Sequence, residues 1–438
     1  MTPAPPRVVT PHSERAREGV HGLKAFADGR DWFFSRRFGL FVHWGLYAIP
    51  AWHEQHHYRL RLPRSEYTKL MHQFNPARFD PDAWLDLAEQ VGMRYLCFTT
   101  KHCDGFCMWD TAYTDFSVMH TPYGRDVLAM LAEACHRRDF PLCLYYSIAD
   151  MHQPNYPNAG RSYELEGSDP GDEPDLGKYI DFVKAQVREL CTNYGEIHGF
   201  WWDANVIEHR DPSINAMIRA LQPNAIINNR GFDDGAFSTP ERDWHRPGSD
   251  VLAFEQPTEA CQSVGTQSWG YRADEDYYTD AHLIRSIDSI LARGGNYLLN
   301  VGPRADGTFP PEGERILRAI GSWYNSVREA FEQAIPASEL TTNREVLLTR
   351  RENTLYVHLC AVPTSTAVIL YPIAARPRRA TLLNTGEDVE TRVDLLPSYH
   401  EQRAECLRLR NLPVNDQCGT ALVVKLEFDA GGLPGPPG

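Results

Sequence analysis

Short apolar runs alternate with amphipathic helical patterns from about residue 38 to residue 333, and this alternation constrains the fold more than any other feature. Seven runs have the length and composition of strands: FGLFVHWG from Phe38, YLCFTTKH from Tyr95, PLCLYYSI from Pro141, GFWWDAN from Gly199, AIINNR from Ala225, VLAFEQ from Val251 and NYLLNVG from Asn296. Helical patterns separate them: PDAWLDLAEQVG, RDVLAMLAEACHRRD, GKYIDFVKAQVRELCTNYG, DAHLIRSIDSILARGG and ERILRAIGSWYNSVREAF. Continuous apolar strands that alternate with helices predict a parallel sheet.

We expect this sheet to close on itself. Seven strands over about 300 residues suit an α/β fold of the (β/α)8-type, a TIM-like barrel, better than an open doubly wound sheet. No glycine-rich phosphate turn of the dinucleotide or Walker type follows the first strand, which argues against the open alternative.

Beyond about residue 340 the pattern changes. VLLTRRENTLYVHLC, TAVILYP, RATLLNTGE and TALVVKLEFD are short strand-like stretches with turn residues between them. Such a series is typical of a small antiparallel β-sandwich. We therefore expect a catalytic barrel over residues 1–336, a C-terminal β-sandwich over residues 337–430, and a disordered Gly- and Pro-rich tail over residues 431–438.

The charge balance excludes a polyanionic partner. The formal net charge is −14 and the chain has no long Lys/Arg run, so its surface repels nucleic acid. No apolar run reaches the roughly 18 residues of a membrane span, and the first residues lack the apolar core of a secretory signal. We therefore expect the ten cysteines to be reduced thiols in a cytoplasmic protein. Neutral sugars suit an acidic chain, and the oligomeric state does not follow from the sequence.

Reactive side chains stand where the strands end. They are His43 and Trp44, Lys101 and His102, Tyr145 and Tyr146, Asp203, and Arg230. In a barrel, the carboxyl ends of the strands meet at one face, where catalytic groups gather. A buried sugar requires hydrogen-bond partners and aromatic faces, and these residue types supply both. Each alone is more often a packing or capping residue, but the ordered series predicts a carbohydrate site.

Asp203 is the first candidate for catalysis. It follows two tryptophans at the end of an apolar strand, where a carboxylate costs several kcal/mol unless it is hydrogen-bonded or used. Glycoside hydrolysis needs a second carboxyl group from another strand or loop. Glu241, in STPERDW, is the preferred partner, and Glu259, in PTEACQS, is the second choice. Both also fit ordinary surface glutamates.

Longer stretches match a known family in its own order. They are FGLFVHWGLYAIPA from Phe38, FTTKHCDGFCMWDT from Phe98, YYSIAD from Tyr145, WWDAN from Trp201, INNRG from Ile227, STPERDW from Ser238, SWGYRADE from Ser268 and GGNYLLNVGPRADG from Gly294. Over essentially the whole catalytic region the sequence resembles the α-L-fucosidases, family 29 of the glycoside hydrolases.

The resemblance implies a barrel with a C-terminal β-domain. It also implies exo-acting, retaining hydrolysis of terminal α-L-fucosides without a metal or other cofactor, on fucosylated oligosaccharides or glycoconjugates. Asp203 then stands at the position of the nucleophile, and Glu241 lies in the stretch where many members carry the acid/base. Contacts to the sugar are implied for His43, Glu54, His102, Trp201, Arg230 and one of two tyrosines, Tyr146 being preferred to Tyr145.

Two positions depart from the family pattern. The family usually has two adjacent histidines where this chain has His102 and Cys103, and it tends to have Trp where this chain has Gln55 after Glu54. A thiol is a poor substitute for imidazole as a hydrogen-bond partner. In the family the histidine pair contacts the axial hydroxyl of fucose. L-Fucose remains the expected sugar, with a related L-sugar as the alternative.

Two other functions compete with this interpretation. HEQHH fits the H-E-x-x-H pattern of zinc hydrolases, with His53 and His57 as ligands and Glu54 as base, but that chemistry needs both histidines on one helical face. Here the motif lies in an expected loop without an apolar helical stripe. The second alternative is a sugar-binding relative that has lost turnover, which the Cys103 and Gln55 departures leave open and the intact Asp203 opposes.

Overall fold

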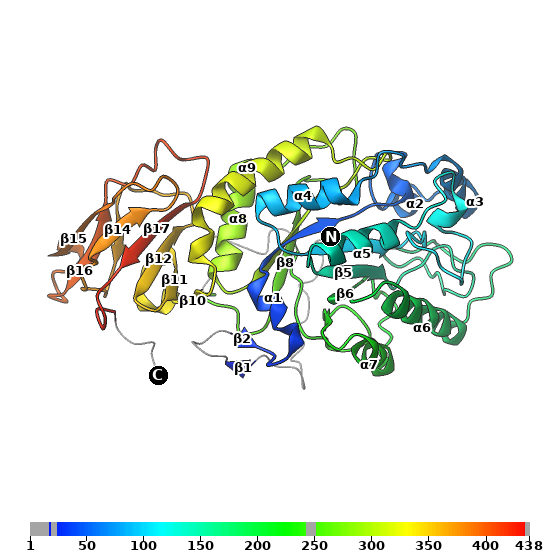
Figure 1. The fold of residues 1–438 in the computed structure, drawn as a ribbon, viewed down its shortest axis with the longest axis horizontal. Helices are drawn as coiled ribbons and strands as arrows, with labels where there is room; N and C mark the ends of the chain where they lie inside the picture. The colour runs from blue at the N-terminus through cyan, green and yellow to red at the C-terminus, as the bar shows by residue number, and fades with distance from the viewer. Residues whose placement is uncertain (1–16, 19–23, 242–250, 434–438) are drawn as a thin grey trace.

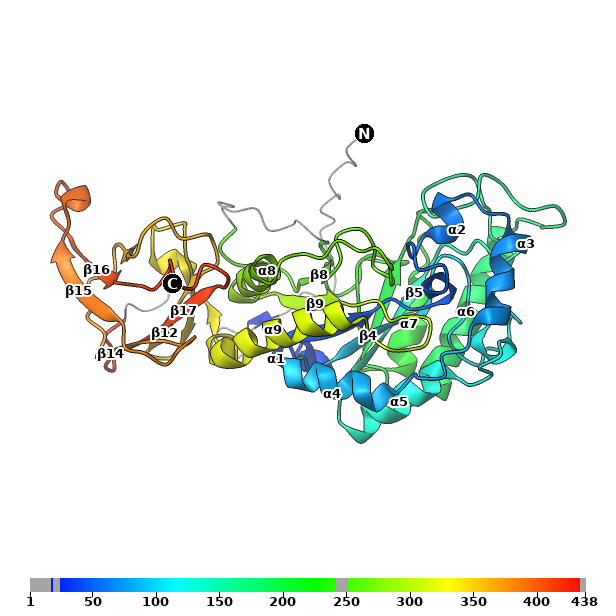
Figure 2. The ribbon, with the colours of Figure 1, turned by 90° about the horizontal axis from the view of Figure 1, so that it is seen from above.

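The structure, a computed structural model, describes residues 17–18, 24–241 and 251–433. It is an α/β protein in which a parallel sheet and its helices form one part and antiparallel sheets form the other (Figure 1). Seen from above, the antiparallel sheets lie at one end of an elongated molecule and the parallel sheet with its helices fills the rest (Figure 2).

Seven parallel strands form the central sheet, in the order β7-β6-β5-β4-β3-β9-β8. They are β3 (Phe38–Val42), β4 (Leu96–Lys101), β5 (Leu142–Ser147), β6 (Gly199–Asp203), β7 (Ile226–Ile227), β8 (Glu259–Ser263) and β9 (Asn296–Asn300). Both faces of these strands are covered, so β3, β4, β5, β8 and β9 are buried along their whole length. The predicted parallel sheet is confirmed.

One predicted strand is wrong. VLAFEQ, from Val251, is not a strand, and Val251 itself is 39% exposed. The strand is instead β8, whose sequence EACQS contains Glu259 and Gln262, both buried. Its polar side chains are tolerated inside because they are hydrogen-bonded there, and a search for apolar runs therefore overlooks the segment.

A short segment over residues 237–241 connects the two ends of the sheet. Isolated parallel bridges pair Phe237 with Asn228, beyond β7, and Ser238 and Glu241 with Thr258 and Cys261, at β8. The candidate acid/base Glu241 is therefore held by backbone pairing beside a strand of the sheet.

The five expected helices are all present, as α4 (Pro81–Val91), α5 (Val127–Arg137), α6 (Leu176–Asn193), α8 (Asp280–Ala292) and α9 (Pro311–Val327). The structure adds α7 (Pro212–Leu221), which sequence analysis did not predict, and single turns at α1 (Trp32–Ser35), α2 (His56–Arg59) and α3 (Arg64–Tyr67). Aspartate side chains cap the first turns of α4, α5, α6 and α7. Gly92, with φ of 92°, ends α4 in the left-handed conformation. The helices lie outside the sheet and leave its carboxyl edge to loops.

The C-terminal region contains two antiparallel sheets, one of order β10-β11-β12-β17-β14 and one of order β13-β16-β15. The strands are β10 (Ile335–Pro336), β11 (Leu347–Arg351), β12 (Thr354–Leu359), β13 (Val368–Leu370), β14 (Arg379–Leu382), β15 (Glu390–Leu395), β16 (Glu405–Arg410) and β17 (Leu422–Glu427). A further two-stranded sheet pairs β1 (Arg17–Glu18) with β2 (Lys24–Ala25). Sequence analysis missed β15 and β16, whose polar residues alternate with apolar ones and do not form an apolar run. Of the expected tail, Leu433 packs into the C-terminal core, and residues 434–438 lie outside the described residues.

All ten cysteines lie in the described part of the chain, and all are free thiols, eight of them buried. No helix among the described residues is long and apolar enough to cross a membrane.

A buried polar contact joins the two parts of the molecule. His358 of β12 contacts Asp288 of α8 through Nδ1 at 2.8 Å, and its Nε2 lies 2.9 Å from the Thr349 hydroxyl. Thr349 donates its own proton to the carbonyl of Ala330, so Nε2 of His358 must donate to Thr349. Both ring nitrogens are thus used, and the side chains of His358 and Asp288 are fully buried.

Removing one partner of this contact should destabilise the protein more than removing both. We expect His358→Ala to lower the free energy of unfolding by about 3–5 kcal/mol, because Asp288 is left buried without its partner. His358→Leu combined with Asp288→Leu should cost less than the two single changes added together. Urea denaturation of His358→Ala, of the two single leucine variants and of the double variant tests this. Additive losses would show that the two side chains do not depend on each other.

Candidate active site

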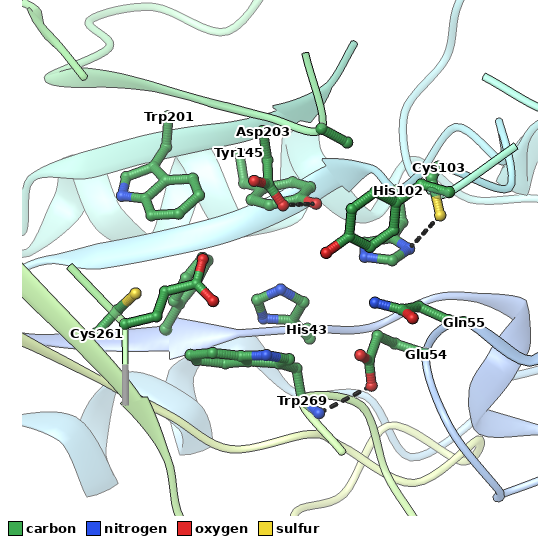
Figure 3. A pocket seen from close by; sticks show the side chains of 14 residues that line it. His43, Glu54, Gln55, His102, Cys103, Tyr145, Trp201, Asp203, Cys261 and Trp269 are labelled. Carbon is green, nitrogen blue, oxygen red and sulfur yellow. Dashed lines mark hydrogen bonds between the residues drawn. The ribbon is translucent and has the colours of Figure 1, made fainter. Parts of the chain in front are cut away.

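A pocket opens at the carboxyl ends of β3, β4, β5 and β6, with an empty volume of about 430 Å³ including its open mouth. Figure 3 shows side chains from these strands and from the loops that follow them converging on it. The lining residues are Phe41, His43, Glu54, Gln55, His102, Cys103, Tyr145, Tyr163, Trp201, Asp203, Ala204, Glu241, Cys261 and Trp269.

Aromatic rings form much of the pocket wall. Tyr145 and Trp201 stack with their ring centroids 5.6 Å apart, and Phe41 packs 5.3 Å from Trp201. On another side, the ring of Trp269 lies 5.3 Å from that of His43. Flat apolar faces beside polar groups suit a pyranose, which has apolar C–H faces and hydroxyls around its rim.

Asp203 ends β6 and points into the pocket (Figure 3). Its Oδ2 accepts a hydrogen bond of 2.8 Å from the Tyr145 hydroxyl, and its Oδ1 accepts one of 3.0 Å from Nη1 of Arg230. The side chain is 26% exposed, so a substrate can reach it. Two donors fix the carboxylate in place, as expected of a nucleophile held for attack.

Glu241 is held close to Asp203 by the same cation. Nη1 of Arg230 donates to Oε1 of Glu241 as well as to Asp203, and the guanidinium lies 4.7 Å from the centroid of the Trp201 ring. Burial alone would lower the pKa of Arg230, but the charges of Glu241 and Asp203 raise it above its ordinary value. Arg230 is therefore a permanent cation between two carboxylates.

His43 presents a hydrogen-bond acceptor to the pocket. Its Nδ1 lies 2.8 Å from Oδ1 of Asn300, whose amide nitrogen donates to Ser263 and to the carbonyl of Trp269. Oδ1 can only accept, so Nδ1 carries the proton and Nε2 keeps its lone pair. Burial and the neighbouring His102 lower the pKa of His43 to about 4, so the ring is neutral at neutral pH.

Glu54 is a buried carboxylate fixed by the loop around Trp269. Its Oε2 accepts hydrogen bonds from the Ser268 hydroxyl at 2.7 Å and from the backbone nitrogen of Trp269 at 2.8 Å. Burial alone would raise the pKa of Glu54, but His53, His102 and Ser268 outweigh it and lower the pKa. The second oxygen points into the pocket in Figure 3, where it can accept from a sugar hydroxyl.

His102, Cys103 and Gln55 lie together on one side of the pocket (Figure 3). The His102 ring stacks on Tyr145, and the Cys103 sulfur lies 3.4 Å from its Nδ1. Burial raises the pKa of the Cys103 thiol well above its ordinary value, so the thiol is neutral. Both departures from the family pattern thus line the pocket.

The structure corrects the choice between the two tyrosines. The hydroxyl of Tyr146 donates to Gln186 at 2.7 Å and accepts from Lys101, inside the protein and away from the pocket. Tyr145 lines the pocket instead. The reason is strand alternation, because Tyr145 pairs in register with Trp201 and so shares the face of Trp201 and Asp203.

Glu259, the second choice for the acid/base, lies in the interior of the sheet rather than in the pocket lining. Its carboxylate accepts hydrogen bonds from the Tyr95 hydroxyl at 2.6 Å and from the indole nitrogen of Trp201 at 3.0 Å. Burial raises its pKa to about 7, against the opposing effect of these two donors. A perturbed pKa alone would favour Glu259, but its position supports Glu241.

The zinc-hydrolase alternative lacks the geometry it requires. Helix α2 begins only at His56, so His53 and His57 do not share a helical face. His57 stacks on Tyr67 with centroids 4.4 Å apart, and Glu54 is held by the Trp269 loop. Among the described residues, no group of three or more His, Cys, Asp or Glu side chains is arranged to hold a metal ion.

Of the residues predicted from sequence, the pocket lining includes His43, Glu54, His102, Trp201, Asp203 and Glu241, and Arg230 contacts the last two. Sequence analysis did not single out Phe41, Tyr163, Ala204, Cys261 or Trp269. Phe41 could have been found, because it precedes His43 by two residues and so shares its strand face. Tyr163 and Trp269 come from loops, for which no strand periodicity exists.

Comparison with known proteins identifies the family. The family model described as Alpha-L-fucosidase matches residues 10–329. Tissue alpha-L-fucosidase of Bos taurus is 25% identical over 393 residues, which cover 82% of this chain and 81% of that protein.

Solved structures agree with this. Alpha-L-fucosidase isoenzyme 1 from Paenibacillus thiaminolyticus superposes with a TM-score of 0.80 and 32% identity, covering 92% of this chain and all of that one. A Bacteroides thetaiotaomicron alpha-L-fucosidase, trapped as a covalent intermediate with 2-fluoro-fucosyl fluoride, has a TM-score of 0.79 and 27% identity over 98% of this chain and 100% of that one. With more than half of its residues matched by the family model, the chain belongs to the alpha-L-fucosidase family.

Proposed function

We propose that this protein removes terminal α-L-fucose from oligosaccharides or glycoconjugates as an exo-acting, retaining glycoside hydrolase. The observation that carries the proposal is that Asp203 and Glu241 accept hydrogen bonds from one nitrogen of Arg230 at an aromatic pocket. Two hydrogen bonds to one atom hold the two oxygens within about 6 Å of each other. Inverting enzymes need about 6.5–9.5 Å between their carboxyl groups to admit a water molecule, so this spacing supports retention.

The reaction then runs in two displacements. The Asp203 carboxylate forms a bond to the anomeric carbon while the glycosidic bond breaks, and protonated Glu241 gives its proton to the departing oxygen. Glu241, now a carboxylate, takes a proton from water as the water oxygen attacks the anomeric carbon. The ester bond to Asp203 breaks, and the sugar leaves with its configuration retained.

Arg230 can stabilise the negative charge at both stages of this cycle. Before attack, the charge lies on Asp203, and after attack Asp203 is an ester and the charge has moved to Glu241. A cation that contacts both groups stabilises each state without moving. The ionised Glu241 paired with Arg230 corresponds to the base of the second displacement.

The remaining pocket residues match the hydroxyls of one sugar. Nε2 of His43 and the second oxygen of Glu54 are acceptors, and His102 adds a third polar group. The trapped fucosyl intermediate of the Bacteroides relative supports fucose as that sugar. A sugar-binding protein without turnover is not favoured, because both carboxylates and their shared cation are in place.

We also infer that the sheet is a closed (β/α)8-type barrel over residues 1–336, with a C-terminal β-sandwich over residues 337–430. The bridges of residues 237–241 to both ends of the sheet support closure, since they take the place of an eighth strand. The separate apolar core of the C-terminal sheets supports a sandwich.

Replacing Asp203 should be the most damaging single change. We expect Asp203→Gly to lower kcat on p-nitrophenyl α-L-fucoside by at least about 10⁴-fold, because the covalent step is lost. Added azide should then restore turnover by direct attack and give a fucosyl azide of inverted configuration, observable by NMR. Asp203→Asn, which keeps the size of the side chain, serves as the control for folding. A retained-configuration product would assign the nucleophile to another residue.

Azide also distinguishes Glu241 from Glu259. In Glu241→Ala, azide needs no general base and should restore turnover, with the azide product of retained configuration. Glu259→Ala should not respond to azide, since Glu259 lies outside the pocket lining. Rates of p-nitrophenol release with and without azide give the answer. The opposite pattern would transfer the acid/base role to Glu259.

The sugar itself is tested with three aryl glycosides. Wild-type kcat/KM should be higher for p-nitrophenyl α-L-fucoside than for the α-L-glucoside, because His43, Glu54 and His102 provide the polar contacts for one arrangement of ring hydroxyls and the glucoside has the opposite configuration at C4. The α-L-galactoside shares the ring hydroxyls of the fucoside and differs only at C6, so its kcat/KM measures how much of the recognition depends on the C6 methyl group. Activity on the glucoside alone would refute fucose as the substrate.

A further inference from the structure

Lys101 is a buried cation that the proposed reaction does not use. It ends β4, directly before His102, and its side chain is completely buried. Its Nζ donates to Oδ2 of Asp150 at 2.8 Å and to the Tyr146 hydroxyl at 2.9 Å. Burial opposes the charge of each partner, but their attraction outweighs it, so the pKa of Lys101 is raised and that of Asp150 is lowered. Taking two charges out of water is costly, and a buried pair is therefore weak evidence of a role in stability alone.

The pairing of β4 with β5 contains a β-bulge at the end of β4. Thr99 pairs with Tyr145, but Lys101 pairs with Tyr146, the next residue of β5, so Thr100 is an extra residue on β4. Successive side chains of a strand point to opposite faces, so one extra residue reverses the face of every side chain that follows. Bulges beside active sites redirect side chains in this way.

The bulge decides whether Lys101 or His102 faces the pocket. Earlier in β4, Cys97 belongs to the same apolar cluster as the pocket residue Tyr145. Regular alternation from Cys97 would point Lys101 toward the pocket and His102 away from it. The bulge gives the opposite arrangement, in which Lys101 reaches Tyr146 inside the protein and His102 lines the pocket (Figure 3).

Asp150 fixes the chain on the other side of His102. Its Oδ1 accepts hydrogen bonds from two backbone nitrogens of its own loop, each at 3.0 Å. In the same loop, the backbone nitrogen of Met151 donates to the carbonyl of Cys103 at 2.9 Å. Gly105, with φ of 86°, approaches so closely that a Cβ there would lie 2.3 Å from Oδ1 of Asp150. The ion pair therefore holds the chain both before and after His102.

We propose that Lys101 and Asp150 are positioning residues for sugar binding, whose buried ion pair holds the β-bulge of β4 and so turns His102 into the pocket. The inference rests on the proposed fucosidase activity, because it takes His102 to contact the sugar. The His102 ring stacks on Tyr145 and is held from both sides, so it offers one orientation to a sugar hydroxyl. Without the ion pair, His102 loses this fixed position and with it the hydrogen bond to the sugar.

The test removes the ion pair in the presence and in the absence of His102. Lys101→Met combined with Asp150→Asn removes both charges together, so neither is left buried without its partner. We expect this double variant to raise the inhibition constant (Ki) of L-fucose about tenfold and to lower kcat/KM for p-nitrophenyl α-L-fucoside by a similar factor, because a hydrogen bond to the sugar is lost. In a chain that already carries His102→Ala, the same two changes should alter Ki by less than about twofold. A general loss of structure would instead weaken binding in both backgrounds.

Two further variants separate positioning from folding. Tyr146→Phe removes the other acceptor of Lys101 but keeps the ion pair, so Ki should stay within about twofold of the wild-type value. If the double variant does not fold, Asp150→Asn alone replaces it in the same comparison, since it keeps the oxygen that accepts from the backbone. Equal rises of Ki with and without His102, no rise at all, or a loss in Tyr146→Phe as large as that of the double variant would overturn the proposal. A wild type that neither hydrolyses the fucoside nor binds L-fucose would instead overturn the proposed function.

Discussion

One guanidinium nitrogen holds two carboxylates at the pocket, and the rest of the site depends on this contact. Asp203 and Glu241 carry like charges and would repel each other without a cation between them. Arg230 offsets that repulsion and keeps one oxygen of each carboxylate within hydrogen-bonding reach of the same nitrogen. Losing Arg230 would leave Asp203 and Glu241 without their shared cation and restore the repulsion between them.

Residues inside the sheet hold Arg230 in position. Its guanidinium lies on Trp201, whose indole nitrogen donates to Glu259, and Glu259 also accepts from Tyr95. Trp201 further stacks on Tyr145, the donor to Asp203. Arg230 and Tyr145, the two donors to Asp203, are therefore each fixed by a second contact deeper in the protein. Such support is what keeps catalytic groups within productive geometry.

The sequence predicted the parts of the structure that follow periodic rules. Strands with two covered faces are apolar throughout, and six of the seven expected runs are strands. Sequence analysis did not predict β8, because Glu259 and Gln262 interrupt its apolar pattern while forming hydrogen bonds inside the sheet. The sequence could not decide between Tyr145 and Tyr146. Two adjacent residues on a strand point to opposite faces, and only the register with β6 shows that Tyr145, not Tyr146, faces the pocket.

The loop residues of the pocket could not be predicted from strand periodicity. Tyr163 lies next to the buried Glu164, which holds residues 156–164 together through its hydrogen bonds. No local sequence pattern predicts that a glutamate will be buried at the centre of a loop. The shared hydrogen bonds of Arg230 likewise depend on backbone pairing of residues 237–241 with β8, which is a contact between distant segments. The ends of the strands indicate which side chains can lie close together. Only the tertiary structure shows that Asp203 and Glu241 share Arg230.

The two departures from the family pattern change the hydrogen-bonding groups that the pocket presents. A neutral thiol at Cys103 is a weak hydrogen-bonding group, so His43, Glu54 and His102 are the stronger polar groups of the lining near it. Gln55 compensates in part, because Arg59 donates to its amide oxygen at 2.8 Å and an arginine can only donate. The amide nitrogen of Gln55 is therefore turned away from Arg59, and in Figure 3 it points toward the pocket, where it can donate to the sugar. The pocket thus presents two imidazoles, His43 and His102, a carboxylate held by the backbone and an oriented amide, in place of the adjacent histidine pair of the family pattern.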